Sequence, residues 1–311
     1  MKYEEYEDFY SNMDVEDEKI LEQWQELKKR KKVVNRITIA IIIMIDIIVL
    51  YKLKTISLFA SMPILIIDLF IYVIAMVISS NGKKTTKLNN EYKEKMVNKM
   101  LSNFIDELDY IPKKGLPSEI YNEANYDRNY NRYYSDDYLE GKIKNQKIVM
   151  ADLNVAREEV KRDKDGNLKT ETITIFQGLF TKINLNKSIN SNLKITRNHY
   201  LMNSTEKKLE LESSEFEKKF EVYTDNPIIG MQMLTADIQE DILEIYNKYK
   251  SDFHILIYRN EMYILFETGR MFELFSTKYT PSEILKKYFE IMKFIYKIVE
   301  KILNTIEDTE I

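Results

Sequence analysis

The sequence predicts an α+β protein in which a two-helix transmembrane hairpin is followed by a soluble domain with a mainly antiparallel sheet and packed helices. Two observations predict the hairpin, namely the apolar runs at residues 37–53 and 56–78 and the very short loop that joins them. A third observation predicts the sheet. Between residues 138 and 266 apolar and polar residues alternate in several short stretches, as in strands that bury one face.

The chain of 311 residues divides into five segments. An acidic cytoplasmic segment ending in a basic cluster covers residues 1–36, and the transmembrane hairpin covers 37–80. An amphipathic helix and a polar loop occupy residues 81–136, the α+β cytoplasmic domain 137–268, and a C-terminal amphipathic helix 269–311. The part that follows the hairpin is long enough to bury a substantial core.

The first apolar run, Ile37 to Leu53, spans about 25 Å as a helix and comes close to the ~30 Å of a bilayer core. The second run is longer and contains Pro63 and Asp68. A water-soluble alternative would need two adjacent helices that are apolar on all sides. A signal peptide does not fit, because the first run begins after 36 residues and no small-residue cleavage pattern follows it. We therefore expect two antiparallel spans.

Basic residues set the expected orientation, since they gather on the cytoplasmic side of a membrane. The loop between the runs carries only Lys52 and Lys54. The hairpin is flanked on both outer sides by basic residues, namely Lys28, Lys29, Arg30, Lys31, Lys32, Arg36, Lys83, Lys84 and Lys87. We expect a multi-pass cell-membrane protein with both termini in the cytoplasm. The same cations are candidates for contacts with lipid headgroups, at ~1 kcal/mol per charge.

Asp46 and Asp68 are unusual because each lies near the middle of an apolar run. An aspartate at that depth costs about 2.5–3.5 kcal/mol on insertion scales. Counted outward from the loop, the two carboxyl groups reach similar depths. One interpretation is an intramembrane pair that shares a proton or binds an ion, and transport would then require an oligomer. The other is that each stays protonated and hydrogen-bonds a neighbouring helix.

Several helices are expected outside the hairpin. Apolar residues at helical spacing predict a helix from about Glu16 toward the membrane and another from Lys84 to Leu108. Residues 118–136 begin as a helix and continue as a polar loop rich in tyrosine. The final helix begins near Pro281, and its broad apolar stripe indicates a core or a dimer surface.

The α+β domain is expected to contain two hairpins and several further strands. One hairpin joins residues 147–155 to 170–176 through a turn at Asp165-Gly166, and the other joins 252–258 to 261–266. Thr235 is a candidate cap for a helix. The remaining predicted elements are strands at residues 180–185, 192–195 and 216–223, and the helix that Thr235 would cap, at residues 234–249.

Composition and motifs exclude several functions. The net charge of −4 gives no support to nucleic-acid binding, and the absence of cysteine excludes disulfides, thiolate zinc sites and cysteine nucleophiles. No phosphate-binding glycine loop, zinc-protease helix, serine elbow or kinase motif is present. Asp163–Asn167 is read as a hairpin turn, because Glu171 comes too early to close a calcium loop. We therefore predict no catalytic, cofactor-binding or metal-binding residues.

Several stretches resemble a bacterial family known only as domain of unknown function thirty-one thirty-seven. The first is Ile175-Phe-Gln-Gly-Leu-Phe180, followed by residues 184–195. The second is Glu215-Phe-Glu-Lys-Lys-Phe-Glu-Val-Tyr-Thr-Asp225, followed by Leu234-Thr235. The predicted hairpin 253–266 and the earlier element 137–142 also resemble the family. The resemblance covers about residues 90–268 and implies a helical hairpin before an α+β cytoplasmic domain. It implies no reaction, cofactor or catalytic residue. Ile229-Gly-Met-Gln-Met233 departs from the family pattern, which often has an arginine there.

We expect a membrane-anchored cytoplasmic binding or scaffold module. The expected partners are membrane lipids and either a protein or a second copy of the chain, without nucleic acid or cofactor. Two alternatives stay open. The first is an enzyme acting on a membrane-proximal substrate, for which a pocket would have to gather His199 or His254 with carboxylates. The second is an oligomeric ion or proton pathway that uses Asp46 and Asp68.

Overall fold

The structure is a computed structural model that describes residues 5–52, 70, 72, 82–162, 164, 167–197, 206–274 and 279–308. It forms two compact units. Unit 1 comprises Met1–Ser11 and Val97–Ile311, and unit 2 comprises Asn12–Met96.

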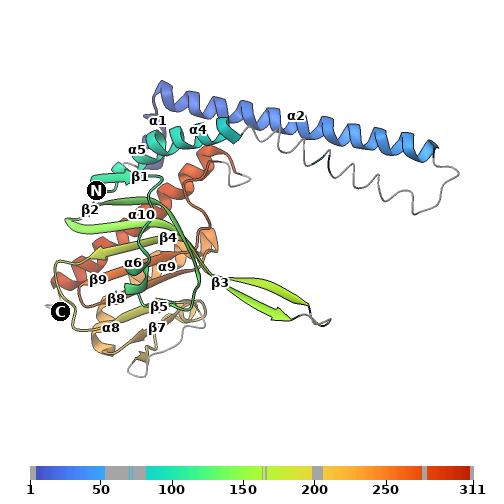
Figure 1. Ribbon diagram of the computed structural model, residues 1–311. Coiled ribbons are helices and arrows are strands. Elements are labelled where there is room, and N and C mark those ends of the chain that lie inside the picture. Colours follow the sequence, from blue (N-terminus) through green and yellow to red (C-terminus); the bar gives the residue numbers. More distant parts are fainter. Residues whose placement is uncertain are drawn as a thin grey trace. The chain divides into compact units, whose positions relative to one another are not determined.

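Unit 1 is built on one antiparallel sheet, in which the described residues form nine strands in the order β1-β2-β3-β4-β9-β8-β5-β7-β6 (Figure 1). Strands that are consecutive along the chain supply most neighbours, and β9 and β8 are inserted between β4 and β5. The strands are β1 (Asp106–Ile111), β2 (Arg132–Ile143), β3 (Gln146–Arg162), β4 (Leu168–Asn184), β5 (Leu193–Thr196), β6 (Lys207–Lys208), β7 (Glu221–Thr224), β8 (Phe253–Tyr258) and β9 (Glu261–Phe266).

Both predicted hairpins are confirmed. β3 and β4 pair from Lys147 opposite Asn184 to Arg162 opposite Leu168, and their far ends extend as a two-stranded ribbon (Figure 1). The expected turn residues Asp165 and Gly166 lie outside the described residues. β8 and β9 pair from Phe253 to Tyr258, as predicted. The separate strands predicted at 170–176 and 180–185 are one continuous strand, β4.

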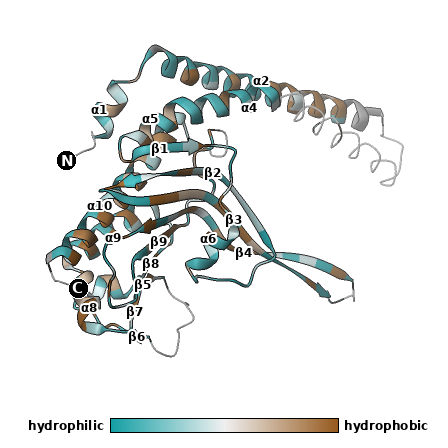
Figure 2. Ribbon diagram, turned by 60° about the vertical axis from the view of Figure 1, so that its left-hand side comes forward, coloured by the Kyte–Doolittle hydropathy of each residue, from teal (hydrophilic) through white to brown (hydrophobic). Residues whose placement is uncertain are grey.

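Helices cover the two faces of this sheet (Figures 1 and 2). On one face Phe294 of α10 contacts Phe253 and Phe266, with ring centroids 5.5 and 6.1 Å apart. On the other face Tyr121 of α6 packs 6.0 Å from Phe180. The helices of unit 1 are α1 (Tyr6–Ser11), α5 (Asn98–Ser102), α6 (Ser118–Glu123), α7 (Ser214–Glu217), α8 (Pro227–Met233), α9 (Ala236–Tyr249) and α10 (Pro281–Asp308).

The predicted final helix is confirmed as α10, and its apolar stripe is core. Ile284, Leu285, Met292, Ile295 and Ile298 are each at most 2% exposed. The N-terminal helix α1 packs against the same helix, because the Tyr6 ring lies 5.5 Å from Phe289 and the Tyr6 hydroxyl donates to the Ser282 carbonyl at 3.0 Å.

Three local predictions were wrong. The strand expected at 216–223 begins as helix α7, because the Ser213 side chain accepts a hydrogen bond from the Phe216 amide and caps a helical turn. Phe216 and Phe220 then meet at the i, i+4 spacing of that turn, with centroids 5.1 Å apart. Thr235 precedes α9 but caps no backbone amide, and its hydroxyl donates to Asp237 instead.

The third wrong prediction is the helix expected over Lys84–Leu108, which ends earlier than predicted. It consists of α4 (Gly82–Tyr92), a π-helical turn at Lys93–Val97 and α5, and Asp106 already lies in strand β1. The four-residue spacing that predicted it is nevertheless a buried series, since Leu88, Tyr92, Met96 and Met100 are at most 2% exposed.

Unit 2 consists of the long helix α2 (Val15–Lys52), which packs against α4. The predicted helix from Glu16 is confirmed, and it continues without a break through the basic cluster into the first apolar run. Ile20, Trp24, Leu88 and Tyr92 are the buried hydrophobic residues in the described part of this pair of helices.

The sequence predicts a transmembrane hairpin, and none is found among the described residues. Across the described ranges, no helix has both the length and the apolar character that a membrane crossing needs. The first predicted run lies within α2 as far as Lys52, and acidic and basic residues of the same helix precede it. Leu53 lies outside the described residues. The second run, 56–78, falls outside the described residues except for Phe70 and Tyr72.

Candidate functional site

Four carboxylates gather on the sheet face that α10 covers. Asp136 and Asp137 come from β2, Asp152 comes from β3, and Glu273 follows β9. One carboxylate oxygen each from Asp136, Asp137 and Glu273 lies within 4.8 Å of the others. Asp136, Asp137 and Asp152 are buried, so the charges of this carboxylate cluster are largely removed from water.

An irregularity in β2 brings the first two of these side chains together. Asp136 pairs with Asp152, and the next pair is Leu139 with Met150, so three steps along β2 match two along β3. This extra residue is a β-bulge, and Asp137 within it has a left-handed φ of 55°. Successive side chains of a regular strand point to opposite faces, whereas the bulge lets both carboxylates reach the same cluster.

Asp152 is the most constrained member of the cluster. Its side chain is 3% exposed, and its Oδ2 accepts a hydrogen bond from the Met271 amide at 3.0 Å. Its Oδ1 is buried without a hydrogen-bond partner. Burial raises the pKa of Asp152 to about 8, and the negative charges of Asp136 and Asp137 add to the increase.

Hydrogen-bond donors surround the outer part of the cluster. The Arg270 guanidinium lies 2.8 Å from Asp136 Oδ2 and 3.8 Å from Glu273 Oε1. The Tyr110 hydroxyl donates to Asp137 Oδ1 at 2.6 Å, and the Tyr134 hydroxyl donates to Asp136 Oδ2 at 3.2 Å.

The sequence analysis named none of these four carboxylates as site residues. Two signals were available in the sequence, namely the doublet Asp136-Asp137 and the single acid at Asp152 within the apolar stretch 148–155. Neither signal shows that a bulge would turn two adjacent side chains to one face.

The residues that the sequence did single out belong to unit 2. Asp46 lies on α2 and is half-buried, whereas Asp68 lies outside the described residues, so their pairing stays a prediction. The basic residues Lys28, Lys29, Arg30, Lys31, Lys32, Arg36, Lys83 and Lys84 are all exposed on α2 and α4. Arg30 pairs with Glu26 at 2.5 Å, and the Lys28 ammonium lies 4.4 Å from the centre of the Trp24 ring.

His254 was one of two histidines considered for catalysis, and His199 lies outside the described residues. His254 is 6% exposed on β8, its Nε2 lies 3.0 Å from the Tyr126 hydroxyl, and its Nδ1 is buried without a partner. Burial lowers its pKa to about 4, Arg197 adds to the decrease, and Asp252 opposes it. These surroundings indicate a neutral structural imidazole rather than an accessible base.

The low pKa of His254 predicts acid sensitivity. As the pH falls, His254 becomes protonated near pH 6.5 in the unfolded chain but only near pH 4 in the folded chain. The free energy of unfolding is therefore unaffected by this group above pH 6.5 and decreases as the pH falls from 6.5 to 4. We expect His254 to lower the free energy of unfolding, measured in urea, by about 2–3 kcal/mol between pH 7.5 and pH 4.5. His254→Gln should make that decrease correspondingly shallower, and equal pH slopes for the two proteins would contradict the prediction.

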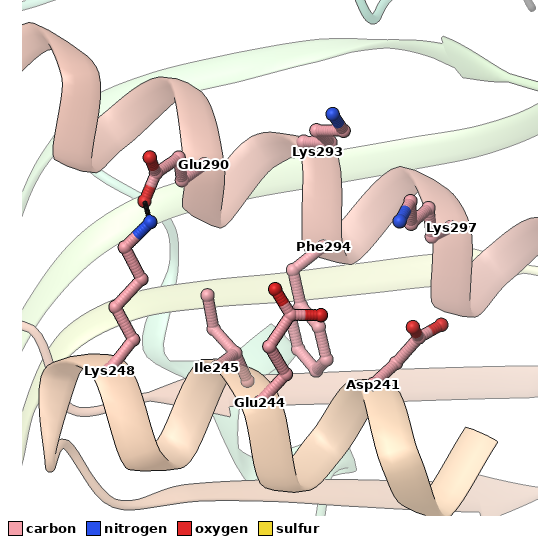
Figure 3. A pocket seen from close by; sticks show the side chains of 8 residues that line it. All are labelled: Asp241, Glu244, Ile245, Lys248, Glu290, Lys293, Phe294 and Lys297. Atoms are coloured by element: carbon pink, nitrogen blue, oxygen red, sulfur yellow. Dashed lines mark ion pairs between the residues drawn. The ribbon is translucent and has the colours of Figure 1, made fainter. Parts of the chain in front are cut away.

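Unit 1 also has a groove between α9 and α10. It has a volume of about 170 Å³ and is floored by Ile245 and Phe294 (Figure 3). Three acidic side chains and three lysines line it, and one pair, Lys248 with Glu290, meets at 2.6 Å across the two helices (Figure 3). Since these charges balance, the groove shows no preference for a charged ligand, and we interpret it as an ion-paired seam.

Comparison with known proteins gives limited information. No curated protein matches the sequence. Among solved structures, a crystal structure of the mycobacterial trehalose monomycolate transport factor A, TtfA, is similar at 6% identity, with 62% of this chain and 88% of that chain covered and a TM-score of 0.36. A likeness this weak supports no inference about this chain. Residues 174–303 match the model of the family described as protein of unknown function (DUF3137), and this match confirms the resemblance carried by the motifs near Gly178 and Phe216.

Proposed function

We propose that the chain is a membrane-anchored binding module, in which α2 and the apolar run 56–78 enter the lipid and unit 1 binds a protein partner on the cytoplasmic side. One observation carries the anchoring. Along the described part of α2, large apolar side chains are between 42% and 60% exposed at Ile37, Ile39, Ile41, Ile43, Met44 and Ile47. They form the apolar section of the helix in Figure 2.

Exposure of this kind is unfavourable in water and favourable in lipid. The sequence from 37 to 50 contains ten Ile, Val or Leu residues. On insertion scales each such residue contributes about 0.3–0.6 kcal/mol, whereas one central aspartate costs about 2.5–3.5 kcal/mol. The apolar residues therefore offset Asp46 and leave insertion marginally favourable for this segment alone.

The exposed cations support the proposed orientation. Lys29, Lys31, Lys32 and Arg36 on α2 point to solvent, and none of them has an ion-pair partner among the described residues. Basic residues next to an inserting segment remain on the cytoplasmic side and are attracted by anionic headgroups. We propose binding rather than catalysis for unit 1, because His254 lacks the solvent access that a general base needs.

Membrane fractionation of tagged full-length chain tests the anchoring. We expect the wild-type chain to remain in the membrane pellet after an alkaline carbonate wash. The double variant Ile43→Lys, Ile47→Lys adds two central charges, each costing about 2.5–3.5 kcal/mol, and should lose that retention. A matched control is Val160→Lys, Leu168→Lys, which places lysines at side chains of similar exposure, 65% and 69%, on the β3–β4 ribbon.

The control variant should stay in the pellet like the wild type. A wild-type chain that is soluble without detergent would contradict the anchoring, and so would equal release of both double variants. Protease added outside spheroplasts tests the orientation. We expect a C-terminal tag to be protected until the membrane is permeabilised, and digestion in intact spheroplasts would contradict a cytoplasmic unit 1.

A further inference from the structure

A pocket in unit 1 lies between the end of α9, the segment after β9 and the first turns of α10. Its volume is about 400 Å³, which is within the roughly 300–1,000 Å³ of small-molecule sites. Ile284 and the side chains of Tyr249, Tyr279 and Tyr288 supply the apolar part of its lining. Ile284 and Tyr288 are at most 3% exposed, so the core holds this part of the wall in place. The pocket therefore offers an apolar wall to a ligand.

Lys287 also lines the pocket, and its charge has no counter-charge among the described residues. Its side chain is half-buried, and no carboxylate lies within ion-pair distance of its ammonium in the described part of unit 1. The centre of the Tyr249 ring is 5.8 Å from the ammonium, near the limit of a cation–π contact. Burial lowers the pKa of Lys287, whereas a hydrogen bond to Glu7 raises the pKa of the adjacent Lys286. An anion would stabilise such a half-buried ammonium.

The acidic residues closest to Lys287 along α10 are engaged with other groups. Glu283 and Glu290 stand four residues before it and three residues after it, which are the spacings at which an acid reaches a lysine on a helix. Glu283 Oε2 accepts hydrogen bonds from the Thr280 amide at 2.7 Å and the Thr280 hydroxyl at 2.8 Å, and so helps to cap the helix. Glu290 pairs with Lys248 at 2.6 Å (Figure 3). Neither acid forms an ion pair with Lys287.

The other basic side chains of the pocket differ from Lys287 because each has an acidic partner. The pairs are Lys248 with Glu290 at 2.6 Å, Lys286 with Glu7 at 2.9 Å and Arg270 with Asp136 at 2.8 Å. A ligand that approaches Lys287 therefore needs to break none of these pairs. It meets one ammonium without a described counter-charge, next to an apolar wall.

We propose that this pocket binds a small organic anion, with one carboxylate or phosphate group paired to Lys287 and an apolar body against Ile284, Tyr249 and Tyr288. Both features of the ligand follow from the lining. A neutral apolar molecule would leave Lys287 without a counter-charge, and an inorganic anion would leave the apolar wall in water. The site is separate from the protein binding proposed for unit 1, and it does not depend on membrane attachment.

Lysine labelling of the detergent-purified full-length chain tests the proposal residue by residue. The probes are benzoate and phenyl phosphate, with neutral benzamide as the control and chloride added to equalise the ionic strength. At least one of the two anions should slow trace acetylation of Lys287 by acetic anhydride, followed by mass spectrometry. At about 10 mM anion, a dissociation constant of about 5 mM gives about threefold protection, and we expect at least that. Lys293 is the internal reference, because it lies on α10 outside the pocket lining and pairs with Glu5 at 2.6 Å.

Two matched substitutions locate the bound anion. Lys287→Met removes the ammonium and keeps a stem of similar length, and it should weaken binding of the protecting anion, measured by calorimetric titration, at least about tenfold. Lys293→Met makes the same change outside the pocket and should leave the affinity within about twofold of the wild type. Because Lys287 has no ion pair to lose among the described residues, its methionine variant should also melt no lower than the wild type.

Protection of Lys287 by either anion supports the proposal, and protection by one anion alone identifies the charged group as carboxylate or phosphate. The proposal is overturned if neither anion protects Lys287 in the folded wild-type chain. It is also overturned by equal protection of Lys287 and Lys293, by equal protection from benzamide, or by an affinity that Lys287→Met leaves unchanged. Each of these results would place the anion elsewhere or show that the charge of Lys287 does not matter.

Discussion

Replacing Gly178 by alanine is expected to destabilise unit 1 by more than about 3 kcal/mol. Gly178 lies in β4 within the family motif, and a Cβ there would overlap the backbone carbonyl oxygen of Phe266 and lie 2.6 Å from the Thr268 amide nitrogen. Both atoms belong to backbone that leads from β9 to the carboxylate cluster, so neither can move aside cheaply. Chemical unfolding followed by circular dichroism measures the change.

Gly269→Ala separates this steric effect from loss of backbone freedom. Gly269 has a positive φ of 70°, but no atom lies within 4 Å of the point that an alanine Cβ would occupy. Its substitution should therefore cost only the strain of a left-handed alanine, about 1 kcal/mol. If the two alanine variants are equally stable, close backbone approach is not the reason that glycine occupies position 178.

Replacing Lys194 by methionine is expected to cost about 3–5 kcal/mol, because it removes one partner of the buried ion pair between Lys194 and Glu206. The Lys194 and Glu206 side chains are 0% and 2% exposed, and their charged atoms meet at 2.5 Å. Methionine keeps the length of the lysine stem, so lost packing contributes little. The free energy of unfolding, measured in urea at pH 7.5, reports the loss.

Two further variants give that prediction its specificity. Lys194→Met combined with Glu206→Gln should recover much of the lost stability, since both charges of the buried pair are then removed together. Lys161→Met breaks the pair with Glu171 on the ribbon, where both side chains are more than half exposed, and should leave stability close to that of the wild type. A Lys194→Met variant as stable as Lys161→Met would contradict the buried-pair interpretation.

The elements that local pattern determines were predicted well. Alternation and turn residues located the β3–β4 and β8–β9 hairpins, and the apolar stripe after Pro281 located α10. The errors arose where one local interaction outweighs periodicity. A capping serine at position 213 converts the start of a predicted strand into α7, and the helix from Gly82 gives way to β1 once the chain joins the sheet.

The candidate site was beyond sequence reasoning for a different reason. Its carboxylates come from positions as far apart as 136 and 273. Strand register places Asp152 opposite Asp136, and a bulge and the segment after β9 bring Asp136, Asp137 and Glu273 together. Lys194 and Glu206 likewise meet as a buried pair only because β5 lies inside the sheet. Periodicity reports which face of an element is buried, but it does not report which distant side chains share that face.

The ribbon formed by the far ends of β3 and β4 has a consequence for local stability. Beyond Ala156 and Thr174 the backbones of the two strands form ladder pairs only with each other in the described structure. Two side chains from outside the ribbon reach it at Glu158: the Asn131 side chain bonds its amide and its carbonyl, and Arg132 forms an ion pair with its carboxylate at 2.8 Å. A lone two-stranded ribbon is marginally stable in water. Its amides should thus exchange with solvent deuterium by local fraying, long before the rest of the sheet opens. Its lysines and glutamates, including Lys161 with Glu171, also discourage other chains from adding a strand to the free edges.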